Sequence, residues 1–159
     1  MIVFADGLTS LTESIMPAIS TTMSADHRRC DEIFSAAEAL VSAGDWSAGG
    51  DRFIAFRDAM LNHFSMEEEK LFPAFEQHLG HTMGPTQVMR MEHNQMKQLF
   101  SEMQQAVKAR DDAQYLGLSE TLMMIMQQHN MKEEQMLYPM MDQTLGQKGG
   151  EMARQIEAH

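Results

Sequence analysis

A short motif that occurs twice constrains the fold of this chain more than any other feature of the sequence. The first copy runs from His63 to Pro73 and reads HFSMEEEKLFP, and the second runs from His129 to Pro139 and reads HNMKEEQMLYP. Each copy has a His, a Glu four positions later, a second Glu, and then Leu, an aromatic residue and Pro. Residues four apart share one face of an α-helix, so each copy predicts a helix that presents an imidazole beside a carboxylate.

The repeat extends well beyond this motif. A shift of 66 residues, which takes His63 to His129, also takes His27 to His93. The same shift aligns apolar residues, namely Met23 with Met89, Phe34 with Phe100, Val41 with Val107 and Met60 with Met126. Two copies with so long a period are too few for a solenoid. The sequence therefore predicts two repeated helical hairpins related by a pseudo-twofold axis.

Four long segments between clusters of Gly and Pro are rich in residues that favour helices. They span about 22–43, 51–78, 85–110 and 112–145. Pro85 suits the first position of a helix, whereas Pro73 and Pro139 should kink or end the helices that contain them. A short additional helix from Glu151 is compatible with the sequence, and residues 1–20 are unassigned.

Short connections between these segments predict an all-α fold, an up-down-up-down four-helix bundle. The length of 159 residues fits a single domain with a sizeable core. The bundle would occupy about 22–145, and the segments 1–20 and 147–159 would flank it.

Composition excludes several classes of partner. The net charge of −11 leaves no basic stripe to neutralise phosphates, so neither a nucleic acid nor an anionic membrane is expected as a partner. No apolar run approaches the roughly 20 residues of a membrane span. The first 16 residues carry Asp6 and Glu13 without a basic region, unlike a secretory signal, and the single Cys30 fits a reducing compartment. A cytoplasmic location is therefore expected.

The motif residues should meet at one height in the bundle. In antiparallel neighbours, two residues lie level when the residue midway between them is in the connecting loop. The midpoints between successive His or His–Glu groups fall at Trp46, Leu79 and Asp112, all in or beside predicted turns. Six side chains are therefore predicted to form one layer: His27, His63, Glu67, His93, His129 and Glu133.

A buried layer of four imidazoles and two carboxylates predicts a metal site. Unpaired carboxylates are costly to ionise in an apolar interior, and bound cations remove that cost. Nitrogen and oxygen ligands without thiolate suit iron, manganese or zinc. Two facing carboxylates can each bridge two metals, and each metal would then keep an open position for a small ligand beside a solvent-derived bridge.

With these residues in place, the sequence resembles the hemerythrin-like, or HHE cation-binding, family over roughly Met23 to Leu145. The resemblance rests on His27, His93 and the two copies of His-x-x-x-Glu-Glu-x-x-Leu-aromatic-Pro. It implies a non-haem di-iron centre in a four-helix bundle, with an oxo or hydroxo bridge between the ions. It further implies that Glu67 and Glu133 bridge, that His27 and His63 share one iron, and that His93 and His129 share the other.

This sequence differs from the oxygen carriers of the family at two positions, and one of these differences affects the function that we expect. Those carriers have a further His where this chain has Lys97, and an Asp where it has Glu133. Without that His both irons are expected to be open, which argues against simple reversible O₂ carriage. We expect Lys97 to face solvent or to lie just outside the metal ligands.

Three classes of function follow. The first is a protein that binds O₂, NO or a similar small ligand for sensing, scavenging or iron handling. The second is a di-iron oxidase or peroxidase, or a nitrosative-stress repair protein; the Glu-x-x-His pattern of ferritin-like oxidases is absent. The third is a structural protein whose layer is filled by zinc or hydrogen bonds.

The neighbours of the six residues have simpler interpretations. Cys30 should be a small core residue, and Glu68 and Glu134 should lie outside the set of ligands. The four paired methionines, Met23, Met60, Met89 and Met126, should form a dry lining one turn away. The remaining histidines, His78, His81 and His159, are expected in a loop or at the end of the chain.

Overall fold

The computed structural model describes residues 17–158, and all regular elements in this range are helical. The α-helices are α1 (Ile19–Ser42), α2 (Trp46–Met66), α3 (Phe72–Leu79), α4 (Pro85–Ala109), α5 (Asp112–Lys132), α6 (Tyr138–Leu145) and α7 (Gln147–Glu157). Two π-helical turns, η1 (Glu67–Leu71) and η2 (Glu133–Leu137), join α2 to α3 and α5 to α6. The all-α prediction is confirmed. In the described range no helix is both long and apolar enough to cross a membrane.

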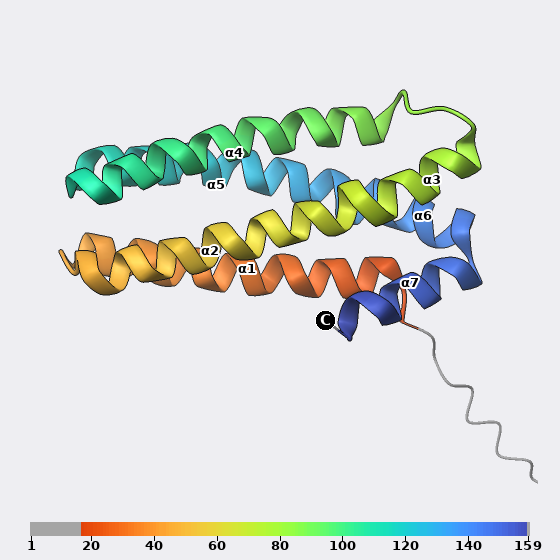
Figure 1. Cartoon of the computed structure of the whole chain (residues 1–159), viewed down its shortest axis with the longest axis horizontal. Coiled ribbons are helices and arrows are strands. Elements are labelled where there is room, and N and C mark those ends of the chain that lie inside the picture. Colours follow the sequence, from red (N-terminus) through yellow and green to blue (C-terminus); the bar gives the residue numbers. More distant parts are fainter. Residues whose placement is uncertain (1–16, 159) are drawn as a thin grey trace, which may run out of the picture.

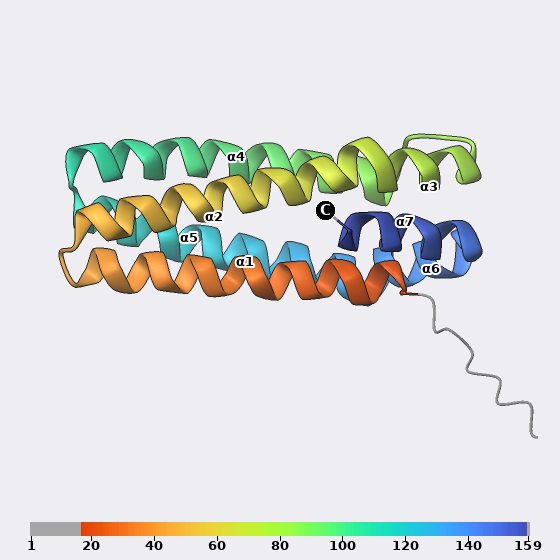
Figure 2. The same ribbon diagram turned by 60° about the horizontal axis from the view of Figure 1, so that its bottom comes forward.

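The long helices are arranged as two hairpins that lie against each other (Figure 1). One hairpin pairs α1 with α2, and the other pairs α4 with α5. Figure 2 shows α7 folded back beside the first turns of α1, at the end where α3 and α6 lie. The helix α7 is therefore an element beyond the four that the sequence predicted, and it begins at Gln147 rather than near Glu151.

The second helix begins earlier than predicted because an aspartate fixes its start. The side chain of Asp45 accepts a hydrogen bond from the backbone N–H of Ala48 at 3.0 Å, so α2 starts at Trp46 and not near residue 51. Gly49 and Gly50, which suggested a turn, lie inside this helix. A Cβ on Gly49 would lie 3.0 Å from Cγ2 of Val41, so the missing side chain lets α2 pack closely against α1.

The repeat places an equivalent cap in the other hairpin. Asp111, 66 residues after Asp45, accepts from the backbone N–H of Gln114 at 3.1 Å and starts α5 at Asp112. The preceding residue, Arg110, ends α4 in a left-handed conformation with φ 50°. The boundaries predicted around this connection agree with the structure.

The prolines of the two motifs do not end their helices. Each follows a π-helical turn, in which the N–H of Phe72 bonds to the carbonyl of Glu67 and that of Tyr138 to the carbonyl of Glu133. A proline ring clashes with the carbonyl four residues before it in an α-helix, and the wider turn relieves this conflict. The helical path therefore continues through Pro73 and Pro139 into α3 and α6.

The core is divided into two apolar clusters. One cluster, around Phe53, Phe56 and Phe100, lies between the helices toward the α1–α2 and α4–α5 connections. The other, around Leu71, Phe75 and Met141, lies toward α7. The predicted histidines and glutamates occupy the interior between these clusters, where water is excluded on both sides.

The end of the second hairpin is attached to the start of the first. Asp142 in α6 accepts a hydrogen bond from the backbone N–H of Ile19 at 2.7 Å, and its other oxygen accepts from the hydroxyl of Ser20. The hydroxyl of Thr22 donates to Glu157 of α7 at 2.7 Å. The contacts with Asp142 cap α1, whose own preceding residue provides no side-chain cap.

Candidate metal centre

All six residues predicted from the repeat lie together in the interior. His27 comes from α1, His63 from α2, His93 from α4 and His129 from α5, while Glu67 and Glu133 each begin a π-helical turn. None of the six side chains is more than 3% exposed. Their assembly in one layer agrees with the prediction from the midpoints, whereas their role as ligands remains a prediction.

Each glutamate contacts one histidine of each pair. Oε1 of Glu133 lies 3.2 Å from Nε2 of His27 and 3.1 Å from Nε2 of His129. Oε1 of Glu67 lies 3.4 Å from Nε2 of His63 and 3.2 Å from Nε2 of His93. Both carboxylates therefore lie between the His27–His63 pair and the His93–His129 pair.

Several of these contacts join atoms that cannot satisfy each other. Among the described residues, six buried side-chain atoms have no hydrogen-bond partner. Four of them face the interior of the cluster: Oε1 of Glu67, Nε2 of His93, Nε2 of His129 and Oε2 of Glu133. Unpaired buried polar atoms are costly and rare in native proteins. A cation placed among them would satisfy their lone pairs. Two sets of residues have donor atoms close enough to share one ion, within 4.8 Å of one another. They are Glu67, His93, His129 and Glu133, and His27, His63 and Glu133.

A second group of carboxylates lies around the histidines, at their Nδ1 atoms. Asp26 contacts His63 at 2.8 Å, Glu92 contacts His129 at 3.0 Å, and Glu68 contacts His93 at 3.0 Å. Glu134 approaches Nδ1 of His27 at 3.4 Å without forming a hydrogen bond. The shift of 66 residues relates Asp26 to Glu92 and Glu68 to Glu134, so this outer group follows the repeat as well.

These outer carboxylates determine which ring nitrogen carries the proton. Burial alone would raise the pKa of Asp26, but the hydrogen bonds from His63 and Arg29 lower it below its usual value. An ionised Asp26 only accepts, so Nδ1 of His63 donates and Nε2 turns its lone pair toward the interior. Glu92 has the same effect on His129, because its bonds to Lys132 and His129 outweigh burial and lower its pKa.

Without a cation, the pKa values of the buried groups shift in opposite directions. Burial, followed by the charge of His129, lowers the pKa of His93 to about 4, so this ring is uncharged at neutral pH. Burial and the charge of Glu133 raise the pKa of Glu67 well above its usual value. Burial lowers the pKa of His129, but the charge of Glu133 outweighs it and raises that pKa above its usual value. Burial likewise raises the pKa of Glu133, but its hydrogen bond to Glu67 and the charge of His129 lower it well below its usual value. A divalent ion, which binds neutral imidazole and ionised carboxylate, would compete with the proton at His129.

Comparison with known proteins supports this interpretation. A family model described as the hemerythrin HHE cation-binding domain matches residues 18–141. This chain belongs to that family. The resemblance inferred from the repeated motif is therefore confirmed. Searches of curated proteins and of solved structures found no match.

One aromatic residue of this HHE domain contacts the cluster and was not predicted to do so. The hydroxyl of Tyr138, which is fully buried, donates to Oε2 of Glu67 at 2.8 Å and lies 3.0 Å from Oε1 of Glu133. Burial and the charges of both glutamates raise its pKa well above the usual value. The signal in the sequence was a difference between the two motif copies, because the equivalent position in the first copy is Phe72.

Asp26 and Glu92 were also missed, although the sequence carries a signal for them. An acidic residue immediately precedes each of His27 and His93, in register with the repeat. Glu68 and Glu134 approach the Nδ1 atoms of His93 and His27, and their exclusion from the set of ligands remains a prediction. Lys97 is partly exposed, and its Nζ lies 3.7 Å from Oε2 of Glu68, just outside the cluster.

The other neighbours mostly behave as predicted. Cys30 is buried, and burial raises the pKa of its thiol to about 12. The four paired methionines are all buried; Met23 and Met89 belong to one apolar cluster, Met60 and Met126 to the other. His81 lies in a loop, whereas His78 lies in the last turn of α3. His159 lies outside the described residues.

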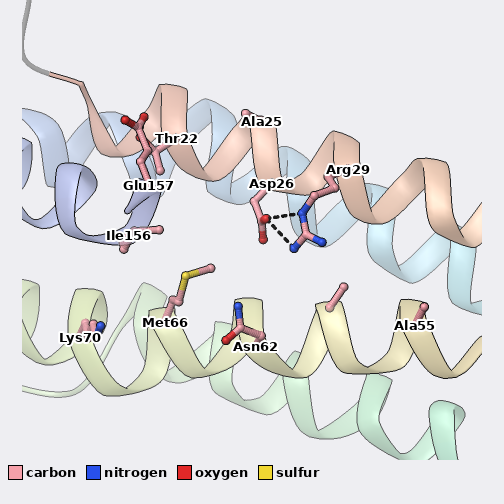
Figure 3. A pocket seen from close by; sticks show the side chains of 11 residues that line it. Thr22, Ala25, Asp26, Arg29, Ala55, Asn62, Met66, Lys70, Ile156 and Glu157 are labelled. Carbon is pink, nitrogen blue, oxygen red and sulfur yellow. Dashed lines mark hydrogen bonds and ion pairs between the residues drawn. The ribbon is translucent and has the colours of Figure 1, made fainter. Parts of the chain in front are cut away.

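A cavity of about 740 Å³ lies outside the cluster of six histidines and glutamates, between α1, α2 and the end of α7 (Figure 3). Asp26 and Arg29 of α1 face Asn62 and Met66 of α2 across it. The described residues that line it include none of the six in the cluster. Asp26 both lines the cavity and binds His63, so it separates this polar space from the buried donors.

Proposed function

We propose that this HHE domain holds two iron ions joined by a solvent-derived bridge and binds a small ligand such as O₂ or NO at them. Its role would be sensing, scavenging or iron handling. His27 and His63 would hold one ion, His93 and His129 the other, and Glu67 and Glu133 would bridge them. In the same proposal the four long helices form an up-down-up-down bundle of two repeated hairpins, with α7 as an addition to it.

The observation that carries this proposal is the arrangement of unsatisfied donors. Glu67 and Glu133 each approach one histidine of both pairs within 3.4 Å. Four of the donor atoms have no hydrogen-bond partner in the described part of the chain. Hydrogen bonds alone therefore do not account for the cluster, whereas two cations between the histidine pairs do.

The protein side chains have definable roles around such a centre. The iron pair would supply the redox and ligand-binding chemistry that the side chains lack. Asp26, Glu68 and Glu92 hold the Nδ1 protons of three histidines, which keeps the Nε2 lone pairs directed inward. The apolar clusters on both sides exclude water, so few competing molecules reach the donors.

Anaerobic reconstitution with ferrous iron, followed by titration with O₂ and NO and measurement of absorption, tests the proposal. We expect about two irons per chain and a near-ultraviolet band after exposure to air. His63→Ala and His129→Ala should each lower the iron content by at least about half. His78→Ala, which removes an exposed histidine outside the cluster, should leave it unchanged.

A folded protein that stays free of iron in this experiment would contradict the proposal. Zinc that is present after purification and resists replacement by iron would favour the structural alternative. Sustained consumption of O₂ or peroxide in the presence of a reductant would instead assign the same centre to an oxidase or peroxidase.

A further inference from the structure

The two halves of the cluster differ in one aromatic side chain. The repeat relates all six predicted ligands to one another, yet it pairs Phe72 with Tyr138. Phe72 stacks on His93, with ring centroids 5.9 Å apart, and offers no donor atom. Tyr138 instead directs its hydroxyl into the layer, on the side of His27 and His63.

The hydroxyl oxygen of Tyr138 has four neighbours within the cluster. It lies 2.8 Å from Oε2 of Glu67, 3.0 Å from Oε1 of Glu133, and 3.3 Å from Nε2 of both His27 and His63. In an octahedral shell with bonds of about 2.1 Å, adjacent donor atoms are about 3.0 Å apart, and each donor has four such neighbours. The four distances match the spacing of a ligand within one coordination shell.

Hydrogen bonding explains only part of this arrangement. A phenol has one proton, so Tyr138 can donate to one of its four neighbours at a time. Glu133 and the inward-facing Nε2 of His63 are also acceptors. When the phenol proton points to Glu67, the lone pairs of these two acceptors and of the phenol oxygen repel one another. A cation among these atoms removes the conflict, as it does for the six predicted ligands.

We propose that Tyr138 is a seventh protein ligand, bound to the metal that His27 and His63 hold. On binding, the O–H bond breaks, oxygen keeps the electron pair and the proton passes to water. This half of the centre then has one protein ligand more than the other. The small ligand consequently binds on the side of His93 and His129, where the rings of Phe64 and Phe72 stack on His93. The inference rests on the proposed function.

Ferric loading of the protein tests this inference spectroscopically. A phenolate bound to ferric iron gives a visible charge-transfer band and enhanced ring vibrations in resonance Raman spectra. We expect both in the wild type, their loss in Tyr138→Phe, and their retention in Tyr115→Phe. Tyr115 is the matched control because it is equally buried but belongs to the apolar cluster around Phe53.

Two further measurements extend the test. Tyr138→Phe opens a position on the iron held by His27 and His63, which then binds NO as the other iron does. The NO bound per chain by the ferrous protein should therefore rise about twofold. Phe72→Tyr, which copies the phenol into the other half, should about double the tyrosinate band and suppress NO binding. For each variant, the iron content is measured to check metal loading, and circular dichroism is measured to check that the helices are intact.

The failures of the two proposals are distinguishable. A wild-type protein that takes up two irons without a tyrosinate signature overturns the role of Tyr138 and leaves the di-iron proposal intact. A signature that persists in Tyr138→Phe, or unchanged NO stoichiometry in that variant, also overturns it. Failure to take up iron at all overturns both.

Discussion

The carboxylate of Asp26 lies 2.8 Å from Nδ1 of His63, across the gap between α1 and α2. The residue before one predicted ligand therefore orients another ligand of the same half-site. The equivalent contact in the second hairpin joins Glu92 to His129 at 3.0 Å. Each hairpin thus contains an acidic side chain that orients one of its histidines, and this side chain belongs to the residue before His27 or His93.

Replacing these positioning carboxylates should weaken metal binding without unfolding the protein. Asp26→Asn and Glu92→Gln each remove the charge that fixes a histidine tautomer, and we expect an affinity loss of about 10- to 100-fold. Competition with a chelator, with ferrous iron or zinc as the metal, measures the change. Asp58→Asn is the matched control, because Asp58 is 61% exposed and pairs only with Arg57 among the contacts described. Equal affinity in all three variants would contradict this role.

Metal removal should destabilise the domain. The buried donors bind the cation only when they are assembled in the folded state, so free metal at about 1,000 times its Kd should add about 4 kcal/mol to the free energy of unfolding. Thermal or urea unfolding with and without a chelator measures this difference. His63→Ala should abolish most of it. An unfolding midpoint that does not depend on metal would refute the prediction.

The ion pair between Glu76 and Arg90 should make stability depend on pH. The hydrogen bond from Arg90 lowers the pKa of Glu76 below 4.5, and the hydroxyl of Thr86 also donates to it at 2.8 Å. A lowered folded-state pKa stabilises the protein above about pH 4.5, and this contribution disappears as the pH falls through the folded-state value.

Glu76→Gln should therefore cost about 1–3 kcal/mol at pH 7 and progressively less below pH 4.5. Urea unfolding of the metal-free protein across this range measures the difference from wild type. Glu120→Gln removes an exposed carboxylate and serves as the control. A cost that stays constant down to pH 3 would show that the charge of Glu76 is not responsible.

Cys30 should be unreactive in the folded protein. It is 1% exposed, and burial raises the pKa of its thiol to about 12, so almost no thiolate is present at pH 8. Labelling with iodoacetamide should proceed only after addition of denaturant. Rapid labelling of the native state would place the thiol in contact with solvent and disprove this assignment.

The sequence predicted the parts of the structure that depend on spacing. Helix type, the hairpin repeat and the meeting of His27 with His93 in one layer all follow from periodicity and from distances along the chain. It predicted less well the features that depend on close packing. Gly49 signalled a turn but lies inside α2, because contact with Val41 requires a residue without a side chain.

The site residues that were not predicted show a second limit of inference from sequence, which concerns the direction of single side chains. Tyr138 occupies a motif position that is simply aromatic in both copies, and only the depth of η2 in the core reveals where its hydroxyl points. Asp26 is an acidic residue on a helix, which usually faces water. Its pairing with His63 depends on the rotation of α1 relative to α2, and periodicity alone does not give that rotation to within one side chain.

The bond between Asp142 and the start of α1 has a consequence for access to the interior of the domain. It joins positions 123 residues apart, and so fastens the first and last parts of the repeat. Because this contact closes the open end of the two hairpins, we expect its loss to let α1 move away from α6. We expect a cation held in this interior to exchange slowly once the domain has closed, and Asp142→Ala to release it to a chelator faster than the wild type does.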